Sequence, residues 1–158
     1  MLGVTPAIRL LEAAGVAFSV HEYDHDPAAP SYGLEAATVL GLDPDQVFKT
    51  LLVTADGGQA VAIVPVSTSL SLRAVAIALG RKRITMCDPA VAQRVTGYVL
   101  GGISPFGQRT RLPTVVDETS QLYDTVYVSG GRRGLDLGVA PADLVRLLDA
   151  ITAAVATV

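Results

Sequence analysis

The two lysines of this chain lie in sequence segments of very different polarity. Two lysines, Lys49 and Lys82, stand against ten arginines. Lys82 lies within the basic run 81–83, where a solvated surface charge is expected, whereas Lys49 lies in the apolar run 47–53, which is typical of a buried strand. A cation on such a strand is costly unless it faces a cleft or an anionic ligand. Lys49 is therefore a candidate site residue, although the residues also allow an ammonium group that extends from a strand end into water.

Two glycine-rich stretches could supply backbone donors to a ligand. Residues 97–107 contain four glycines and Pro105, and residues 128–136 combine glycines with a serine, two arginines and Asp136. A loop of this kind can bring main-chain N–H groups against a carbonyl or a phosphate without obstruction by side chains. The alternative is a plain connection between two strands.

The other reactive residue types fit structural roles better. Cys87 follows an apolar run and has no His and Asn in a recognisable protease context, which favours an inert thiol. His21 and His25 are four residues apart, but in a strand-to-turn segment rather than a helix, so their rings need not converge on a metal. Basic clusters at 81–83, 109–111 and 132–133 favour a phosphate-binding rim in an otherwise acidic chain.

Capping residues and apolar periodicity predict the elements that must position these groups. Helices are expected over 5–15, 31–41, 71–80 and 88–97, and the last helix begins at Pro141 and carries Leu144, Leu147, Leu148 and Ile151 on one face. The turn at 56–58 predicts a hairpin of strands 48–55 and 59–65. Further strands are expected at 16–23, 84–86, 112–116, 125–128 and 135–139. This order predicts an α+β domain with a mixed sheet, not a doubly wound one.

Composition narrows the class of protein. The 158 residues, half of them apolar, are enough for one domain with a real core. A net charge of −3 and few aromatic residues argue against bulk nucleic-acid binding and against a stacking platform for single strands. A single cysteine, no signal-peptide pattern and no apolar run of 18 residues lead us to expect a cytoplasmic protein without a membrane span.

Several blocks, in order, resemble one known family. They are Thr5-Pro6-Ala7, Tyr23-Asp24-His25-Asp26-Pro27, the run 47–53, Asp88-Pro89, Thr96-Gly97-Tyr98, Gly101-Gly102-Ile103-Ser104-Pro105 and Ser129-Gly130-Gly131. Together they resemble the YbaK family of aminoacyl-tRNA deacylases, which is related to the editing domain of bacterial prolyl-tRNA synthetase. The likeness covers nearly the whole chain and is greatest to the Cys-tRNA(Pro) deacylase branch.

The resemblance implies a fold, a reaction and a set of site residues. It implies one editing domain over residues 1–158, with a largely antiparallel curved sheet and surrounding helices. It implies trans-editing hydrolysis of mischarged Cys-tRNA(Pro), assisted by the thiol of the substrate, with no cofactor and no metal. Lys49 would anchor the terminal adenosine or its phosphate and orient the ester. The catalytic positions that match are Lys49, Gly101 and Pro105, and the binding positions are Tyr23, Gly102, Ile103, Ser104, Ser129 and Asp136.

The sequence leaves other readings open. One is a noncatalytic module that binds tRNA or a synthetase, which retention of Lys49, Gly101 and Pro105 disfavours. Another is a deacylase for a different amino acid, such as Ala or Ser, which the volume of the pocket would decide. The partner implied is aminoacyl-tRNA, with prolyl-tRNA synthetase joining in a ternary complex as a further hypothesis.

Overall fold

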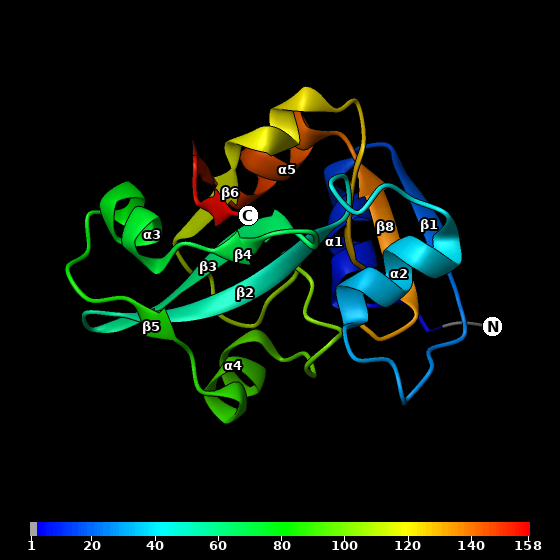
Figure 1. The fold of residues 1–158 in the computed structure, drawn as a ribbon. Coiled ribbons are helices and arrows are strands. Elements are labelled where there is room, and N and C mark those ends of the chain that lie inside the picture. The colour runs from blue at the N-terminus through cyan, green and yellow to red at the C-terminus, as the bar shows by residue number, and fades with distance from the viewer. Residues whose placement is uncertain (1–2) are drawn as a thin grey trace.

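A computed structural model describes residues 3–158 of the chain (Figure 1). The helices are α1 (Pro6–Ala14), α2 (Tyr32–Leu40), α3 (Leu72–Leu79), α4 (Pro89–Thr96) and α5 (Pro141–Leu148), with a short 3-10 helix η1 (Glu118–Leu122). The strands are β1 (Phe18–Glu22), β2 (Phe48–Ala55), β3 (Gly58–Pro65), β4 (Ser69–Leu70), β5 (Thr85–Met86), β6 (Thr114–Asp117), β7 (Val126–Ser129), β8 (Leu135–Val139), β9 (Ile151–Ala153) and β10 (Ala156–Thr157).

Local capping chemistry sets the helix boundaries. The side chains of Thr5, Ser31, Ser71 and Asp88 each accept a hydrogen bond from a backbone N–H of the first turn of α1, α2, α3 and α4. The same four helices end at glycines with left-handed backbone conformation, which residues with a Cβ adopt at a cost. The predicted helices at these four places are confirmed.

The strands form a mixed five-stranded sheet and an antiparallel three-stranded sheet. The first has the order β5-β2-β3-β6-β9, in which β3 pairs with β6 and β6 with β9 in parallel. The second has the order β1-β8-β7. A parallel bridge between Val47 and Tyr127 joins the two sheets next to the start of β2, and β4 and β10 form a small separate pair. The predicted α+β class with a mixed, largely antiparallel sheet is confirmed.

The β2–β3 hairpin spans the molecule between two groups of elements. Figure 1 shows α3 and β5 at one end of the hairpin and α1, α2, β1 and β8 at the other. Phe48 and Leu52 of β2 are buried in the larger core cluster, together with Leu11 of α1 and Leu137 of β8. Val53 belongs to a second cluster beneath α3. Because side chains alternate along a strand, Lys49 lies on the same face as Val53.

The prediction for Ile151 was wrong. Helix α5 ends at Leu148, because Asp149 adopts a left-handed conformation with φ of 50° and the Ala150 N–H bonds back to the Val145 carbonyl. Ile151 then begins β9 and pairs with Val115 of β6. The spacing of Ile151 from Leu144, Leu147 and Leu148 would fit one more helical turn, but pairing with β6 places Ile151 in a strand instead.

Among the helices of residues 3–158, none has the length and apolar composition needed to span a membrane.

Candidate functional site

A cavity of about 350 Å³ opens between the start of β2, the N-terminal end of α2, strand β8 and the glycine-rich loop after α4. This volume falls in the range typical of small-ligand sites. Its walls are formed by Tyr23, Pro30, Ser31, Tyr32, Gly33, Ala36, Val47, Phe48, Lys49, Thr50, Leu51, Leu100, Gly101, Ile103, Ser129 and Asp136. Six of the nine predicted site residues are among them, namely Tyr23, Lys49, Gly101, Ile103, Ser129 and Asp136.

Lys49 lines this cavity, and its ammonium group has no acidic partner among the described residues. Its Nζ donates a 2.6 Å hydrogen bond to the carbonyl of Thr68, which follows β3. No carboxylate among the described residues forms an ion pair with it. Burial lowers the pKa of Lys49 below the usual value, because the charged form loses solvation. One of its three N–H donors is thus occupied, and two remain for an acceptor in the cavity.

A buried carboxyl lies in the same cavity. Asp136 on β8 is 6% exposed, directly opposite His21 of β1 and Ser129 of β7 in the sheet register. Burial raises the pKa of Asp136 to about 7. Tyr23 follows β1, and burial, with smaller contributions from the charges of Asp136 and Glu35, raises its pKa to about 12. At neutral pH the cavity therefore holds a tyrosine hydroxyl that stays protonated and a carboxyl near its midpoint of ionisation.

The glycine-rich loop offers two backbone donors to the cavity. The N–H of Gly102 is occupied by the Val99 carbonyl at 2.9 Å. The N–H groups of Gly101 and Ile103 have no hydrogen-bond acceptor among the described residues, and both residues line the cavity. An unpaired backbone N–H at a cavity wall is suited to a carbonyl or an oxyanion.

Gly101 has to be a glycine for two reasons. Its φ of 82° lies in the left-handed region, and a Cβ placed there would lie 2.6 Å from the ring of Tyr32. Tyr32, the first residue of α2, therefore rests directly on the loop at the edge of the cavity. A side chain at position 101 would displace either this ring or the loop.

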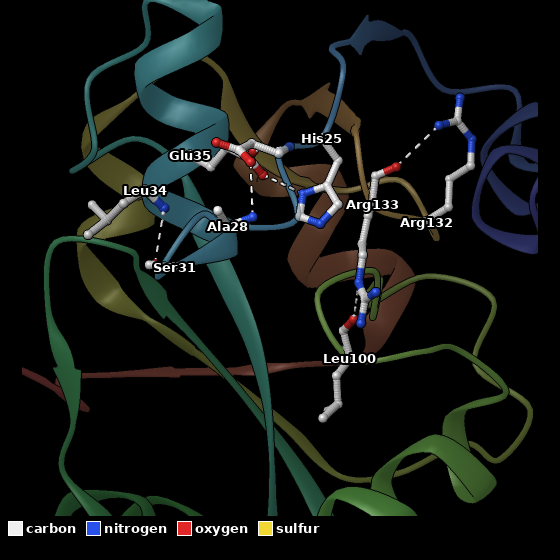
Figure 2. A network of polar contacts seen from close by, with 9 residues as sticks. His25, Ala28, Ser31, Leu34, Glu35, Leu100, Arg132 and Arg133 are labelled. Atoms are coloured by element: carbon white, nitrogen blue, oxygen red, sulfur yellow. Dashed lines mark hydrogen bonds and ion pairs between the residues drawn. The ribbon is translucent and has the colours of Figure 1, made fainter.

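Polar and aromatic contacts surround Tyr32, and Figure 2 shows the polar ones, between His25 and Glu35 and between Arg133 and Leu100. The ring of His25 lies 5.6 Å from the Tyr32 ring, and its Nδ1 lies 2.7 Å from Glu35 Oε1. Glu35 Oε2 also accepts a 2.6 Å hydrogen bond from the Asp26 backbone N–H. The Arg133 guanidinium carbon lies over the same Tyr32 ring, 5.0 Å from the ring centre. These contacts hold the loop before α2 and the loop after β7 at the mouth of the cavity.

Three predicted site residues lie away from the cavity walls. Gly102 packs against backbone, since a Cβ there would lie 2.7 Å from the Cα of Arg132. Ser104 is fully buried, with its Oγ accepting from the Phe106 N–H at 3.2 Å. Pro105 lines a smaller cavity of about 100 Å³ beside α5. Their roles remain predictions, and their placement is that of residues that shape the loop.

Sequence reasoning missed Tyr32 and Thr50. The hydroxyl of Thr50 is buried and has no hydrogen-bond partner among the described residues, although Thr50 also lines the cavity. Tyr32 is one of eight aromatic residues in a chain without tryptophan, and this scarcity was the signal that could have singled it out. No comparable signal in the sequence distinguishes Thr50.

The remaining reactive residues stay outside the site. Within residues 3–158, no group of three or more His, Cys, Asp or Glu side chains is arranged to hold a metal ion. His21 Nε2 lies 2.8 Å from the Ser19 hydroxyl, whereas His25 contacts Glu35. The half-buried Cys87 lies 3.5 Å from the Asp88 carbonyl and is not part of the cavity wall.

Comparisons with known proteins identify the family of this chain. Residues 26–147 match the family described as the aminoacyl-tRNA editing domain. The chain is 32% identical, over 97% of its length and 93% of the relative's, to a protein of Enterococcus faecalis provisionally named Cys-tRNA(Pro)/Cys-tRNA(Cys) deacylase EbsC. It is also 31% identical over 64% of its length to 17% of a proline–tRNA ligase of Geobacter metallireducens.

A solved structure shows the same fold. This crystal structure, provisionally described as a trans-editing enzyme for prolyl-tRNA synthetase, superposes with a TM-score of 0.83 at 25% identity. The superposition covers 99% of this chain and all of the other. These matches show that the chain belongs to the aminoacyl-tRNA editing domain family.

Proposed function

We propose that this protein is a free-standing deacylase that hydrolyses mischarged Cys-tRNA(Pro) in the cytoplasm and so protects the fidelity of translation. The name of the Enterococcus faecalis relative, a Cys-tRNA(Pro)/Cys-tRNA(Cys) deacylase, supports this substrate. The description of the solved structure, a trans-editing enzyme for prolyl-tRNA synthetase, supports the editing role. The observation that carries the proposal is the half-buried Lys49 ammonium, which faces a cavity without an acidic partner among the described residues. Such a cation suits an ester of an anionic nucleic acid.

The cavity lacks an activated protein nucleophile. Of the described residues in its wall, none is a cysteine or a histidine. The Ser31 hydroxyl caps α2, and the Ser129 hydroxyl accepts from the Gly131 N–H at 3.3 Å. Neither hydroxyl is hydrogen-bonded to a histidine or a carboxylate in the described part of the chain, so neither has a base to activate it.

The thiol of the substrate can replace a protein nucleophile. Its sulfur attacks the ester carbonyl of the same cysteinyl group, the carbon–sulfur bond forms and the ester carbon–oxygen bond breaks. The thiol proton ends on the ribose oxygen, which leaves as the free 3′ end of tRNA, and the cyclic thiolactone then opens by addition of water. Because the reacting groups belong to one molecule, holding them in the right geometry supplies much of the rate.

Polar groups of the cavity, other than the Thr50 hydroxyl, have roles in this reaction. The two free donors of Lys49 bind oxygens of the ester and the terminal adenosine. The N–H groups of Gly101 and Ile103 stabilise the developing oxyanion. The Asp136 carboxylate accepts from the α-ammonium group of the cysteinyl moiety, and the protonated Tyr23 hydroxyl donates beside it.

Deacylation of preformed substrates tests this function. Single-turnover rates are measured with tRNA(Pro) charged with cysteine, serine, alanine or proline. We expect fast loss of cysteine, at least tenfold slower loss of serine because a hydroxyl is the poorer nucleophile, and retention of proline. Equal rates for the cysteine and serine esters would overturn the thiol mechanism and keep the deacylase. Faster loss of alanine than of cysteine would make alanine the amino acid that the enzyme removes. If no ester were hydrolysed, the protein would be a noncatalytic binding module.

Selection of the tRNA is proposed to depend on a partner. The net charge of −3 and the few aromatic residues give the protein little means to read bases. Prolyl-tRNA synthetase in a ternary complex could supply that selection. Rates on Cys-tRNA(Pro) and Cys-tRNA(Cys) should then be similar without the synthetase and differ with it, and a strong intrinsic preference for tRNA(Pro) would contradict this.

A further inference from the structure

The two neighbouring arginines at the mouth of the cavity have different surroundings. Arg132 forms an ion pair with Glu22 at 3.0 Å and also donates to the backbone carbonyl of Arg133 at 3.2 Å. Arg133 forms no ion pair with any described residue. The sequence grouped the two as one basic cluster, whereas the structure leaves only the second charge available to a ligand.

Arg133 is nevertheless held in a defined orientation. Its Nε donates a 2.8 Å hydrogen bond to the carbonyl of Leu100 (Figure 2). Its guanidinium carbon lies over the ring of Tyr32, 5.0 Å from the ring centre. Both Leu100 and Tyr32 line the cavity. One face of the guanidinium is thus directed to an aromatic ring and one donor is used, while neither Nη atom has an acceptor among the described residues.

The backbone also fixes this arginine at the glycine-rich loop. A Cβ at Gly102 would lie 3.0 Å from the Arg133 N and closer still to Arg132, so the two loops are in direct contact. The side chain of Arg133 then crosses to Leu100, 33 residues earlier in the chain. This places an oriented, exposed cation at the rim through which a ligand would enter.

An oriented guanidinium with a free Nη edge suits a phosphate. The planar fork donates two parallel hydrogen bonds to phosphate oxygens, and prior ordering of the side chain lowers the entropy lost on binding. A ligand whose aminoacyl ester occupies the cavity presents its ribose and then its first phosphodiester at the rim. We propose that Arg133, held by Tyr32 and the Leu100 carbonyl, binds the phosphodiester next to the terminal nucleoside of aminoacyl-tRNA, an inference that rests on the proposed function.

Substrates with and without this phosphate test the assignment. One substrate is a cysteinylated acceptor-stem microhelix of tRNA(Pro) ending in CCA, and the other is 3′-O-cysteinyl adenosine, which has no phosphate. Single-turnover deacylation is measured against protein concentration for the wild type, Arg133→Ala, Arg133→Lys and the matched control Arg132→Ala. Thermal melts confirm that each variant is folded.

The expected pattern is specific to Arg133. Arg133→Ala should raise the half-saturating concentration for the microhelix roughly 10- to 30-fold and leave its maximal rate within about twofold. Arg133→Lys should give an intermediate effect, since an ammonium keeps the charge and loses the fork. Arg132→Ala should change it less than about threefold, and no variant should alter turnover of cysteinyl adenosine. Equal effects on both substrates, or equal effects of Arg132→Ala and Arg133→Ala, would overturn the assignment.

Binding of the uncharged microhelix separates this inference from the proposed function. Fluorescence anisotropy at several salt concentrations should show a slope of log affinity against log salt that is shallower by about 0.7 for Arg133→Ala. Normal deacylation with unchanged slope and affinity in this variant would overturn the phosphate contact alone. A shallower slope in a protein that hydrolyses no ester would support the contact and overturn the deacylase.

Discussion

A lysine and a glycine lie at or beside each end of the β2–β3 hairpin, in different surroundings. At the turn end, Gly57 has a φ of 80°, and Lys82 lies exposed with its backbone N–H bound to Asp56. At the cavity end, Gly101 has a φ of 82°, and Lys49 lies half-buried with its Nζ bound to a carbonyl. Residue type and backbone conformation are thus nearly matched, while the neighbours differ.

Enclosure is what turns one end into a site. A Cβ at Gly57 would meet nothing within 4 Å, whereas one at Gly101 would meet the ring of Tyr32. The second sheet and α2 cover the Lys49 end and lower the pKa of that lysine by burial. The six residue steps from Lys49 to Ala55 separate the two ends by roughly 20 Å at the usual strand rise. The basic run 81–83 is therefore remote from the cavity.

The largest difference is expected between the two lysines. Lys49→Ala should keep the fold and lower single-turnover deacylation of Cys-tRNA(Pro) roughly 10- to 100-fold, the equivalent of losing a charge-assisted contact of about 1.5–3 kcal/mol. Lys49→Arg should also be impaired, because the bulkier fork does not fit the same place. Lys82→Ala is the matched control and should keep the wild-type rate. A folded and fully active Lys49→Ala protein would remove Lys49 from the site.

Substitution of Gly57 and of Gly101 compares the two ends of the hairpin a second time. Gly57→Ala should cost about 1–2 kcal/mol of stability, from the left-handed backbone alone, and leave deacylation unchanged. Gly101→Ala should carry that cost and also displace Tyr32, with a loss of roughly tenfold or more in rate. Chemical denaturation and single-turnover assays of both variants measure the two effects. Equal losses of activity in both would show that the contact with Tyr32 is immaterial.

Asp136 predicts opposite pH trends for stability and activity. Its pKa is raised from 3.8 to about 7 on folding, so the folded protein binds more protons between these values, and its stability should fall as pH rises from 3.8 to about 7 and level off above. Deacylation should rise as pH passes through about 7, because the ionised form accepts from the substrate ammonium group. Asp136→Asn should flatten both profiles and gain on the order of 2 kcal/mol in stability at pH 8.

A matched carboxylate at the other end of the hairpin controls for general charge effects. Asp56→Asn, measured by the same melts and rates from pH 5 to pH 9, should retain the wild-type shape of both profiles. If Asp136→Asn left the pH dependence of stability intact, the buried carboxyl would not be its source.

The smallest expected effect concerns Thr50. Its buried hydroxyl lacks a partner among the described residues, so Thr50→Val should raise the free energy of unfolding by up to about 1 kcal/mol. Thr54→Val on the same strand, nearer the turn, serves as the comparison for the change in β propensity. A destabilised Thr50→Val protein would indicate that the hydroxyl has a partner in solution, such as a bound water.

Local chemistry in the sequence was enough to predict most elements. A capping side chain bonds a backbone N–H only three residues along the chain, so Thr5, Ser31 and the terminal glycines predicted helix ends that the structure confirms. The hairpin followed from its turn in the same way. Lys49 was recognisable because a charged group in an apolar run loses solvation when the strand is buried, whichever element the strand packs against. The error at Ile151 arose where periodicity competed with pairing to a distant strand.

Contacts between distant segments were decided by the tertiary structure alone. The Tyr32 ring rests on Gly101, and Arg133 reaches Leu100, through packing of segments that no local pattern brings together. The same packing pairs Arg132 with Glu22 and leaves the neighbouring Arg133 unpaired, although the sequence presents two adjacent and equivalent arginines. The sequence by itself determined which residues could carry charge and which turns could form. Whether a given charge or backbone donor is free depends on which partners the folded chain places beside it, and that is a property of the whole fold.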